Sequence, residues 1–96
     1  MDEITILRHD AGNHGEYRAE IAPGKSVGRL TWTSRGTARV VDHTVVPSAY
    51  REHGIAAKLV AALVADARAE GFQIDPVCSY VAAQFRRHPE WRDLLA

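Results

Sequence analysis

The first half of the chain consists of short runs of β-branched and apolar residues separated by turn signatures. Within these runs apolar and polar positions alternate, which is typical of strands that bury one face. Glycine, proline and asparagine mark the turns, because they tolerate or preset the dihedral angles that turns need. Strands joined by such short turns pair antiparallel, so we expect a four-stranded meander. The predicted strands are Ile4–Leu7, Tyr17–Ile21, Val27–Thr33 and Thr37–Val46, and the predicted turns are His9–Gly15, Ala22–Lys25 and Ser34–Gly36.

The second half begins with the strongest helical pattern in the sequence. From about His53 to Glu70, apolar residues recur with helical spacing, and Gly71 follows as a C-terminal stop. Several alanines in the segment also favour a helix. The residues expected on its buried face are Ile55, Leu59, Val60, Leu63, Val64 and Ala67.

Three shorter elements complete the pattern. Phe72–Val77 is a predicted strand, and Pro76 within it lacks an N–H, so this strand should lie at an edge or splay from its neighbour. Ser79–Arg87 is a predicted helix with Ser79 as a suitable N-cap, and Pro89–Leu95 is a terminal helical piece. The expected order is β-β-β-β-α-β-α, an α+β fold in a single domain over residues 1–96.

Composition limits the classes of function. Lys plus Arg and Asp plus Glu number 12 each, so the formal net charge is zero and broad binding to nucleic acid or an anionic membrane is not expected. A lone cysteine, Cys78, cannot form an internal disulfide, which favours a reducing, cytoplasmic location. The acidic N-terminus does not read as a signal peptide, and charged residues in the long helix argue against a membrane span. The five histidines show no paired ligand spacing with Cys78, so no metal site is expected.

The segment Arg51–Ala56 lies between the fourth predicted strand and the long helix. The first N–H groups of a helix lack intrahelical partners and carry partial positive charge, and Gly54 would let an anion approach the backbone. A strand, a glycine-containing loop and a helix in this order can form a phosphate cradle. An ordinary strand-to-helix turn is the alternative, and the loop by itself favours that alternative.

This loop resembles the acyl-CoA loop of the GNAT superfamily of N-acetyltransferases, written R/Q-x-x-G-x-G/A, through Arg51, Gly54 and Ala56. Two flanking segments strengthen the resemblance: His43–Pro47 before the loop, and Pro76–Pro89 after the long helix. In this order and spacing the chain looks like the small, single-domain GNAT-like subfamily, mainly from Trp32 to Leu95. The resemblance implies a minimal GNAT-like (acyl-CoA N-acyltransferase) fold without its usual first helices, with acetyl-CoA or coenzyme A as cosubstrate.

The resemblance also implies a cofactor-binding set. The backbone of Val45 and Val46 would meet the pantetheine arm where two neighbouring strands splay apart, although plain core packing is the alternative. The residues expected to bind the pyrophosphate are Arg51, Glu52, His53, Gly54, Ile55 and Ala56. Glu52 departs from the family pattern, in which many members have glycine, and a carboxylate there disfavours a nearby pyrophosphate.

Two side chains are candidates for catalysis. Cys78 precedes a helix, where a thiol loses its proton more readily, and the resemblance places it near the acyl thioester. His43 could accept a proton from the incoming acceptor. Each has a structural alternative: an inert buried thiol for Cys78 and a hydrogen-bonded structural imidazole for His43. Tyr80 could protonate the departing CoA thiolate, but core packing is favoured, and Arg86 and Arg87 could meet the 3′-phosphate or stabilise a helix end.

The leading hypothesis is therefore a small N-acetyltransferase that moves an acetyl group from acetyl-CoA to an unidentified amine, of a small molecule or a protein, directly or through Cys78. A CoA-binding module with little or no turnover is the alternative. A DNA-binding helix over residues 50–71 is a third reading, against which the zero net charge and the β-rich first half both count.

Overall fold

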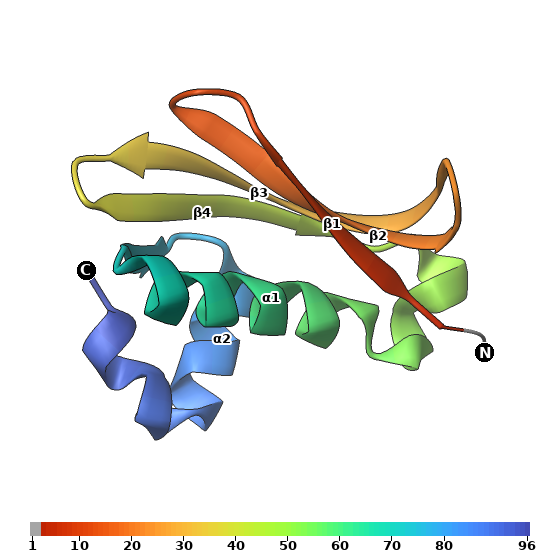
Figure 1. The fold of residues 1–96 in the computed structure, drawn as a ribbon. Coiled ribbons are helices and arrows are strands. Elements are labelled where there is room, and N and C mark those ends of the chain that lie inside the picture. Colours follow the sequence, from red (N-terminus) through yellow and green to blue (C-terminus); the bar gives the residue numbers. More distant parts are fainter. Residues whose placement is uncertain (1–2) are drawn as a thin grey trace.

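The computed structural model describes residues 3–96 and contains one mixed sheet with helices packed on it (Figure 1). The elements are β1 (Thr5–Asp10), β2 (His14–Ala22), β3 (Lys25–Arg35), β4 (Ala38–Val45), the 3-10 helix η1 (Ser48–His53), α1 (Ile55–Glu70), β5 (Gln73–Pro76), α2 (Ser79–Arg87) and the 3-10 helix η2 (Pro89–Leu94).

The sheet has the strand order β1-β2-β3-β4-β5, in which the first four strands form the predicted antiparallel meander. β2 and β3 are longer than the segments of alternating apolar and polar residues predicted, because both strands extend almost to the turns that follow them. β2 begins at His14, which the sequence placed in a turn, and β3 runs to Arg35. Main-chain hydrogen bonds continue past the point where apolar alternation stops, so polar residues at strand ends escape a pattern-based prediction.

The helices lie on one face of the sheet (Figure 1). The predicted apolar face of α1 is buried as expected, over the six positions from Ile55 to Ala67. It packs on side chains from the facing strands, among which Tyr17, Leu30 and Trp32 are almost fully buried. The core is the single layer between the sheet and the helices, to which Val81 and Phe85 of α2 and Leu94 of η2 also contribute. Within residues 3–96 no helix covers the opposite face of β1–β4 (Figure 1).

Four local features differ from the prediction. The segment before α1 is not an open loop but the 3-10 helix η1, and α1 begins at Ile55 rather than His53, because Gly54 adopts a left-handed φ of 69° that interrupts the helical path. Cys78, not Ser79, occupies the N-cap of α2. The terminal helical piece is a 3-10 turn rather than an α-helix. In the described part of the chain no helix has the length and apolar character needed to cross a bilayer.

β4 and β5 pair only briefly. Their parallel register joins Ala38 to Gln73 and ends with Val41 beside Pro76. The last contact is the Cys78 N–H, which donates to the Val41 carbonyl at 2.9 Å. Beyond it β4 continues to Val45, while the other chain turns into α2. The edge strand predicted from Pro76 is therefore confirmed, and the sheet opens between β4 and the start of α2.

Candidate functional site

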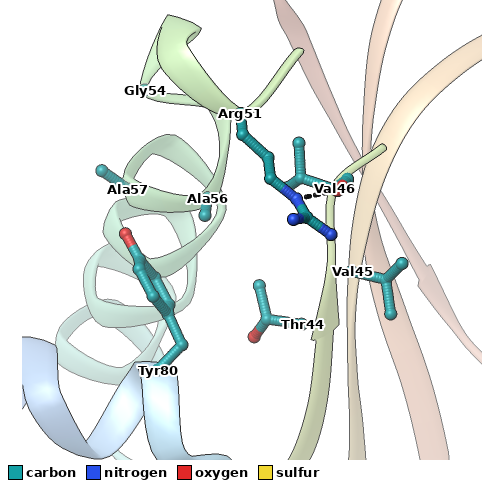
Figure 2. A pocket seen from close by; sticks show the side chains of 8 residues that line it. All are labelled: Thr44, Val45, Val46, Arg51, Gly54, Ala56, Ala57 and Tyr80. Carbon is teal, nitrogen blue, oxygen red and sulfur yellow. Dashed lines mark hydrogen bonds between the residues drawn. The ribbon is translucent and has the colours of Figure 1, made fainter. Parts of the chain in front are cut away.

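A cavity of about 550 Å³ lies where the sheet opens. Its walls come from the end of β4, from η1, from the start of α1 and from the start of α2. Figure 2 shows Arg51, Thr44 and Tyr80 facing the space between β4 and α1. The lining residues are Thr44, Val45, Val46, Arg51, Gly54, Ala56, Ala57 and Tyr80.

The N-terminus of α1 borders this cavity without a cap of its own. Gly54 is the N-cap residue, has no side chain, and leaves the helix without a side-chain cap hydrogen bond. The first turn also contains no acidic residue. The N–H groups of Ile55, Ala56 and Ala57 precede the first intrahelical bond, which runs from the Lys58 N–H to the Gly54 carbonyl at 3.1 Å. These groups and the helix dipole present positive potential to the cavity, which suits an anion.

Arg51 adds a full positive charge at the same place. Its Nε donates to the Val46 carbonyl at 3.3 Å, which ties η1 to the end of β4 (Figure 2). Within residues 3–96 neither terminal nitrogen of the guanidinium hydrogen-bonds to protein. Those two nitrogens are therefore available to a ligand.

Cys78 lies at the inner end of the opening. Its Sγ is 3.6 Å from Oγ1 of Thr44, a residue that lines the cavity. Burial by itself raises the pKa of the Cys78 thiol, but hydrogen bonds from the backbone of Val81, from the Thr44 hydroxyl and from the backbone of Tyr80 outweigh it. The net result is a pKa below the ordinary value, because the thiolate sits at the start of α2.

His43 is exposed on β4, next to Thr44 in the chain but on the other face of the sheet. It pairs with Thr31, next to a register shift in which Asp42 and His43 together oppose that one residue. Thr44, which contacts Cys78, pairs with the buried Leu30 on the helix-covered face. Because neighbouring strand positions point to opposite faces, His43 belongs to the open face. Among the described residues no hydrogen bond joins His43 to Cys78, so the structure does not bring the two predicted catalytic residues together.

The predicted cofactor-binding residues divide into two groups. Those that line the cavity are Val45, Val46, Arg51, Gly54 and Ala56. Glu52 and His53 are exposed on η1, and the Ile55 side chain is fully buried, which leaves only its backbone to a ligand. Because Glu52 is exposed and not part of the lining, its charge lies outside the cavity wall.

Sequence reasoning left three lining residues out of the site. Thr44 was missed because a polar residue within a β-branched strand carries no distinctive signal, although it shares a face with Val46. Ala57 was missed because its contribution is an N–H in the first turn. Tyr80 was assigned to core packing; it does pack against the core while also lining the cavity.

Two other expectations concern groups away from the cavity. Arg86 and Arg87 are exposed at the C-terminal end of α2, and neither lines the cavity. Within residues 3–96 no group of three His, Cys, Asp or Glu side chains is placed to hold a metal ion.

Comparison with known families decides what kind of protein this geometry belongs to. The family model described as GCN5-related N-acetyl-transferase matches residues 16–94, which is most of the chain. The chain belongs to this family.

Solved structures of the GNAT family have the same fold. A GCN5-like candidate N-acetyltransferase from Staphylococcus aureus matches 94% of this chain and 87% of its own, with 19% identity and a TM-score of 0.71. An acetyltransferase from Elizabethkingia anophelis, solved with acetyl-CoA bound, matches 95% and 76%, with 15% identity and a TM-score of 0.65. Nourseothricin acetyltransferase is larger, and the chain covers only 50% of it. At these identities the likeness establishes the α+β GNAT fold.

Proposed function

We propose that this protein binds acetyl-CoA in the cavity and transfers the acetyl group to an amine. The observation that carries the proposal is the uncapped N-terminus of α1, which meets the two terminal guanidinium nitrogens of Arg51 at one cavity of about 550 Å³. Three consecutive free N–H groups and one guanidinium match the charge and the acceptor oxygens of a pyrophosphate. Family membership and the acetyl-CoA-bound relative from Elizabethkingia anophelis support the same assignment.

The pantetheine arm would follow the opened edge of β4. Beyond Val41, that edge has no strand partner on the β5 side within residues 3–96, so its main-chain groups are available. Amides of the arm can pair with them as an added strand would. Val46 lines the cavity beside this edge and supplies apolar contact, while Val45 borders the cavity through its backbone and turns its exposed side chain away from α1 (Figure 2). This path leads from the phosphates at Gly54 toward Thr44 and Cys78.

In the direct reaction a neutral amine attacks the thioester carbonyl carbon. The C–N bond forms, the C–S bond breaks, the amine loses one proton and CoA leaves as a thiolate that takes up a proton. Tyr80 lines the cavity and its hydroxyl can supply that proton. No metal is needed for these steps, because the thioester is already activated.

In a covalent route the Cys78 thiolate attacks first. Its Sγ forms a thioester with the acetyl group while CoA departs, and the amine then attacks this second thioester and releases Cys78. The lowered pKa of Cys78 and its contact with Thr44 at the cavity support this route.

A CoA-binding module with little turnover is the second candidate. The observation that favours it is that His43 lies on the open face of the sheet and Cys78 on the helix-covered face, so within residues 3–96 no hydrogen bond joins this imidazole to the thiol. Binding without release of free CoA in the presence of amines would distinguish this module from an enzyme.

Calorimetric titration of CoA and acetyl-CoA tests the proposal. We expect saturable binding that Arg51→Gln weakens by about tenfold, the effect of one lost charge-assisted interaction. Arg92→Gln is the matched control, because Arg92 is an exposed arginine in η2 away from the cavity. Absence of binding at millimolar ligand, or equal weakening by both variants, would sink the proposal. Intact mass of the acetyl-CoA sample, compared with Cys78→Ala, then separates the covalent route from the direct one.

A further inference from the structure

A hollow of about 470 Å³ lies between β5, α2 and η2, near the end of the chain. We call it the C-terminal hollow. Its apolar walls include Pro76 of β5, Phe85 of α2, Pro89 at the start of η2 and Leu95 just after η2. It shares no lining residue with the cavity at α1. A hollow of this volume has the size of a small-molecule site.

Contacts between neighbouring elements hold the walls of the C-terminal hollow in place. The Ala96 N–H donates to the Ile74 carbonyl at 2.9 Å, which ties the end of the chain to β5. Arg68 of α1 donates to Asp93 at 3.0 Å and to the Glu90 carbonyl at 2.9 Å, which fixes η2 beside α1. The hollow is therefore preformed, and a ligand does not have to order these segments when it binds.

The charge of the C-terminal hollow is positive. Arg86 from α2 and Arg92 from η2 line it, and no carboxylate does. Within residues 3–96 neither guanidinium makes a hydrogen bond or an ion pair with the protein. The acidic residues of the adjoining segments have other partners, in the pairs Asp75–Arg35, Asp93–Arg68 and Glu90–His88. Two guanidinium groups are therefore available to an anion.

The position of Arg86 in its helix does not by itself require a ligand. The C-terminal end of a helix favours cations, and Arg87 lies at the same end of α2 without lining the hollow. Arg86 differs because it shares the hollow with a second arginine, which comes from another element. Two like charges at one hollow repel each other, and an anion between them turns this repulsion into attraction.

Apolar surface beside these charges remains open to solvent. Among residues 3–96 the exposed large hydrophobic side chains are Val45, Val77 and Leu95. Leu95, which is 37% exposed, lines the C-terminal hollow. Exposed apolar surface with a polar rim is typical of a binding site. An inorganic anion would leave this surface in water, whereas an anion with a hydrocarbon body covers it.

We propose that the C-terminal hollow binds a small carboxylate with an apolar body, of the arylcarboxylate or alkylcarboxylate class. The carboxylate offers one oxygen to Arg86 and one to Arg92, and its hydrocarbon part rests on Pro89 and Leu95. This site goes beyond the proposed acetyl transfer and does not depend on it, because the two hollows have separate linings.

The test is a titration with phenylacetate, followed by amide NMR shifts of the whole chain. Hexanoate is the second probe, in which an alkyl chain replaces the ring. Phenylacetamide keeps the ring without the charge, and acetate keeps the charge without the ring. We expect saturable shifts centred on Arg86, Arg92 and Leu95 with phenylacetate or hexanoate. Phenylacetamide and acetate should each bind at least about tenfold more weakly, because each lacks one of the two contacts.

Two neighbouring arginines make the test specific. Arg86→Gln is expected to weaken the better probe by about tenfold, as the loss of one charge-assisted contact does. Arg87→Gln is the matched control, because it removes the same charge from the next position, outside the hollow. Thermal scans check that both variants fold. Equal weakening by the two variants, equal binding of phenylacetamide, or no saturable shifts below about 10 mM probe would overturn the proposal.

A further pair of variants separates this inference from the proposed function. Arg92→Gln should weaken phenylacetate and leave CoA unchanged, and Arg51→Gln should do the reverse. Phenylacetate binding in a protein that does not bind CoA would support the C-terminal hollow and refute the acetyl-CoA assignment. CoA binding without any response to phenylacetate or hexanoate would refute the hollow alone. Tighter binding of the dipeptide acetyl-Gly-Phe would assign the hollow to the C-terminus of a polypeptide and overturn the small-molecule class.

Discussion

The two ends of α1 are held in opposite ways. At its N-terminal end Gly54 provides no side-chain cap, the first turn has no acidic residue, and the free N–H groups meet a cavity. At its C-terminal end Arg8, from β1, donates to Asp66 at 3.0 Å and also to Glu70. One end is tied to the sheet by charged contacts, while the other keeps its polar groups available.

Further contacts strengthen the C-terminal end. The Gly71 N–H caps the helix by donating to the Ala67 carbonyl at 2.8 Å. The Tyr17 hydroxyl donates to Asp66 at 2.7 Å, and burial together with this hydrogen bond raises the pKa of Tyr17. Arg68 donates to Asp93 at 3.0 Å, which secures η2 against the same end.

The two ends of α1 differ in how much they contribute to the stability of the fold. The interactions that fix α1 on the sheet are concentrated away from the cavity, so the N-terminal turn can face a ligand without unfolding the helix. Unsatisfied groups at a helix end disfavour the free protein slightly and favour whatever anion binds them. Variants at the two ends should therefore separate binding from stability.

The largest expected effect is on binding, from Gly54→Asp. Aspartate tolerates the left-handed φ of 69° and places a carboxylate where the pyrophosphate would sit. We expect CoA affinity to fall by about a hundredfold, or about 2.7 kcal/mol. Gly54→Asn is the matched control, with the same shape and no charge, and should lose much less. Calorimetry measures both, and similar losses in the two variants would mean that shape, not charge, governs the site.

A second prediction compares the two left-handed glycines. Gly54 (φ 69°) and Gly71 (φ 81°) both have free space for a Cβ, so alanine at either position meets backbone strain but no clash. Each substitution should cost about 1–2 kcal/mol of unfolding free energy. Urea denaturation measures this cost. Only Gly54→Ala should also weaken CoA, and a comparable effect of Gly71→Ala on CoA would contradict the separation of the two ends.

Arg8→Met should lower Tm by about 4–8 °C and leave CoA affinity unchanged, because methionine keeps the apolar stem and loses the charge. Hydrogen bonds from Arg8 lower the carboxyl pKa of Asp10 and Glu70 below the ordinary values of 3.8 and 4.5. A carboxylate whose pKa is lower in the folded chain than in the unfolded chain stabilises the fold at pH values above its unfolded-state pKa. This stabilisation is lost as the pH falls through the folded-state pKa. Below about pH 5 the wild type should therefore lose more stability than Arg8→Met. Thermal scans from pH 7 downward measure this, and parallel pH profiles would refute it.

The smallest expected effect concerns Cys78. Because its pKa lies below the ordinary thiol value of 9.0, alkylation by iodoacetamide should persist to a lower pH than with a free thiol. Thr44→Val removes a hydroxyl that stabilises the thiolate and should move the midpoint of the rate profile upward. Saturating CoA should slow the alkylation of Cys78. An unchanged midpoint in Thr44→Val would show that the helix start alone sets the thiol chemistry.

Much of the architecture was readable from the sequence because it depends on local patterns. The alternation in Val27–Thr33 and the helical spacing from Ile55 to Ala67 each commit one face to burial, and both faces are buried in the structure. Pro76 correctly predicted an edge strand, since a missing N–H forbids a full ladder. The predicted ends of the helices were less accurate. At Gly54, a single residue with left-handed φ ends η1 and precedes α1 without changing the apolar pattern of the sequence.

The candidate site was only partly readable. Arg51, Gly54 and Ala56 are close in sequence, so a short motif identifies them, and all three line the cavity. Thr44 and Tyr80 line the same cavity, although they lie 36 positions apart in the sequence. No local sequence pattern predicts that two such distant residues meet. The irregularity that gathers Asp42 and His43 opposite Thr31 was also invisible, because a shift in register is a property of two strands together.

The sequence by itself determined the order of elements and the buried face of α1, because these follow from residue type and spacing. Only the tertiary structure decided which polar groups share a space. Cys78 approaches Thr44 because β5 leaves β4 after Val41, and His43 faces the other way because strand positions alternate. Both outcomes depend on long-range pairing, whose geometry exists only once the chain has folded.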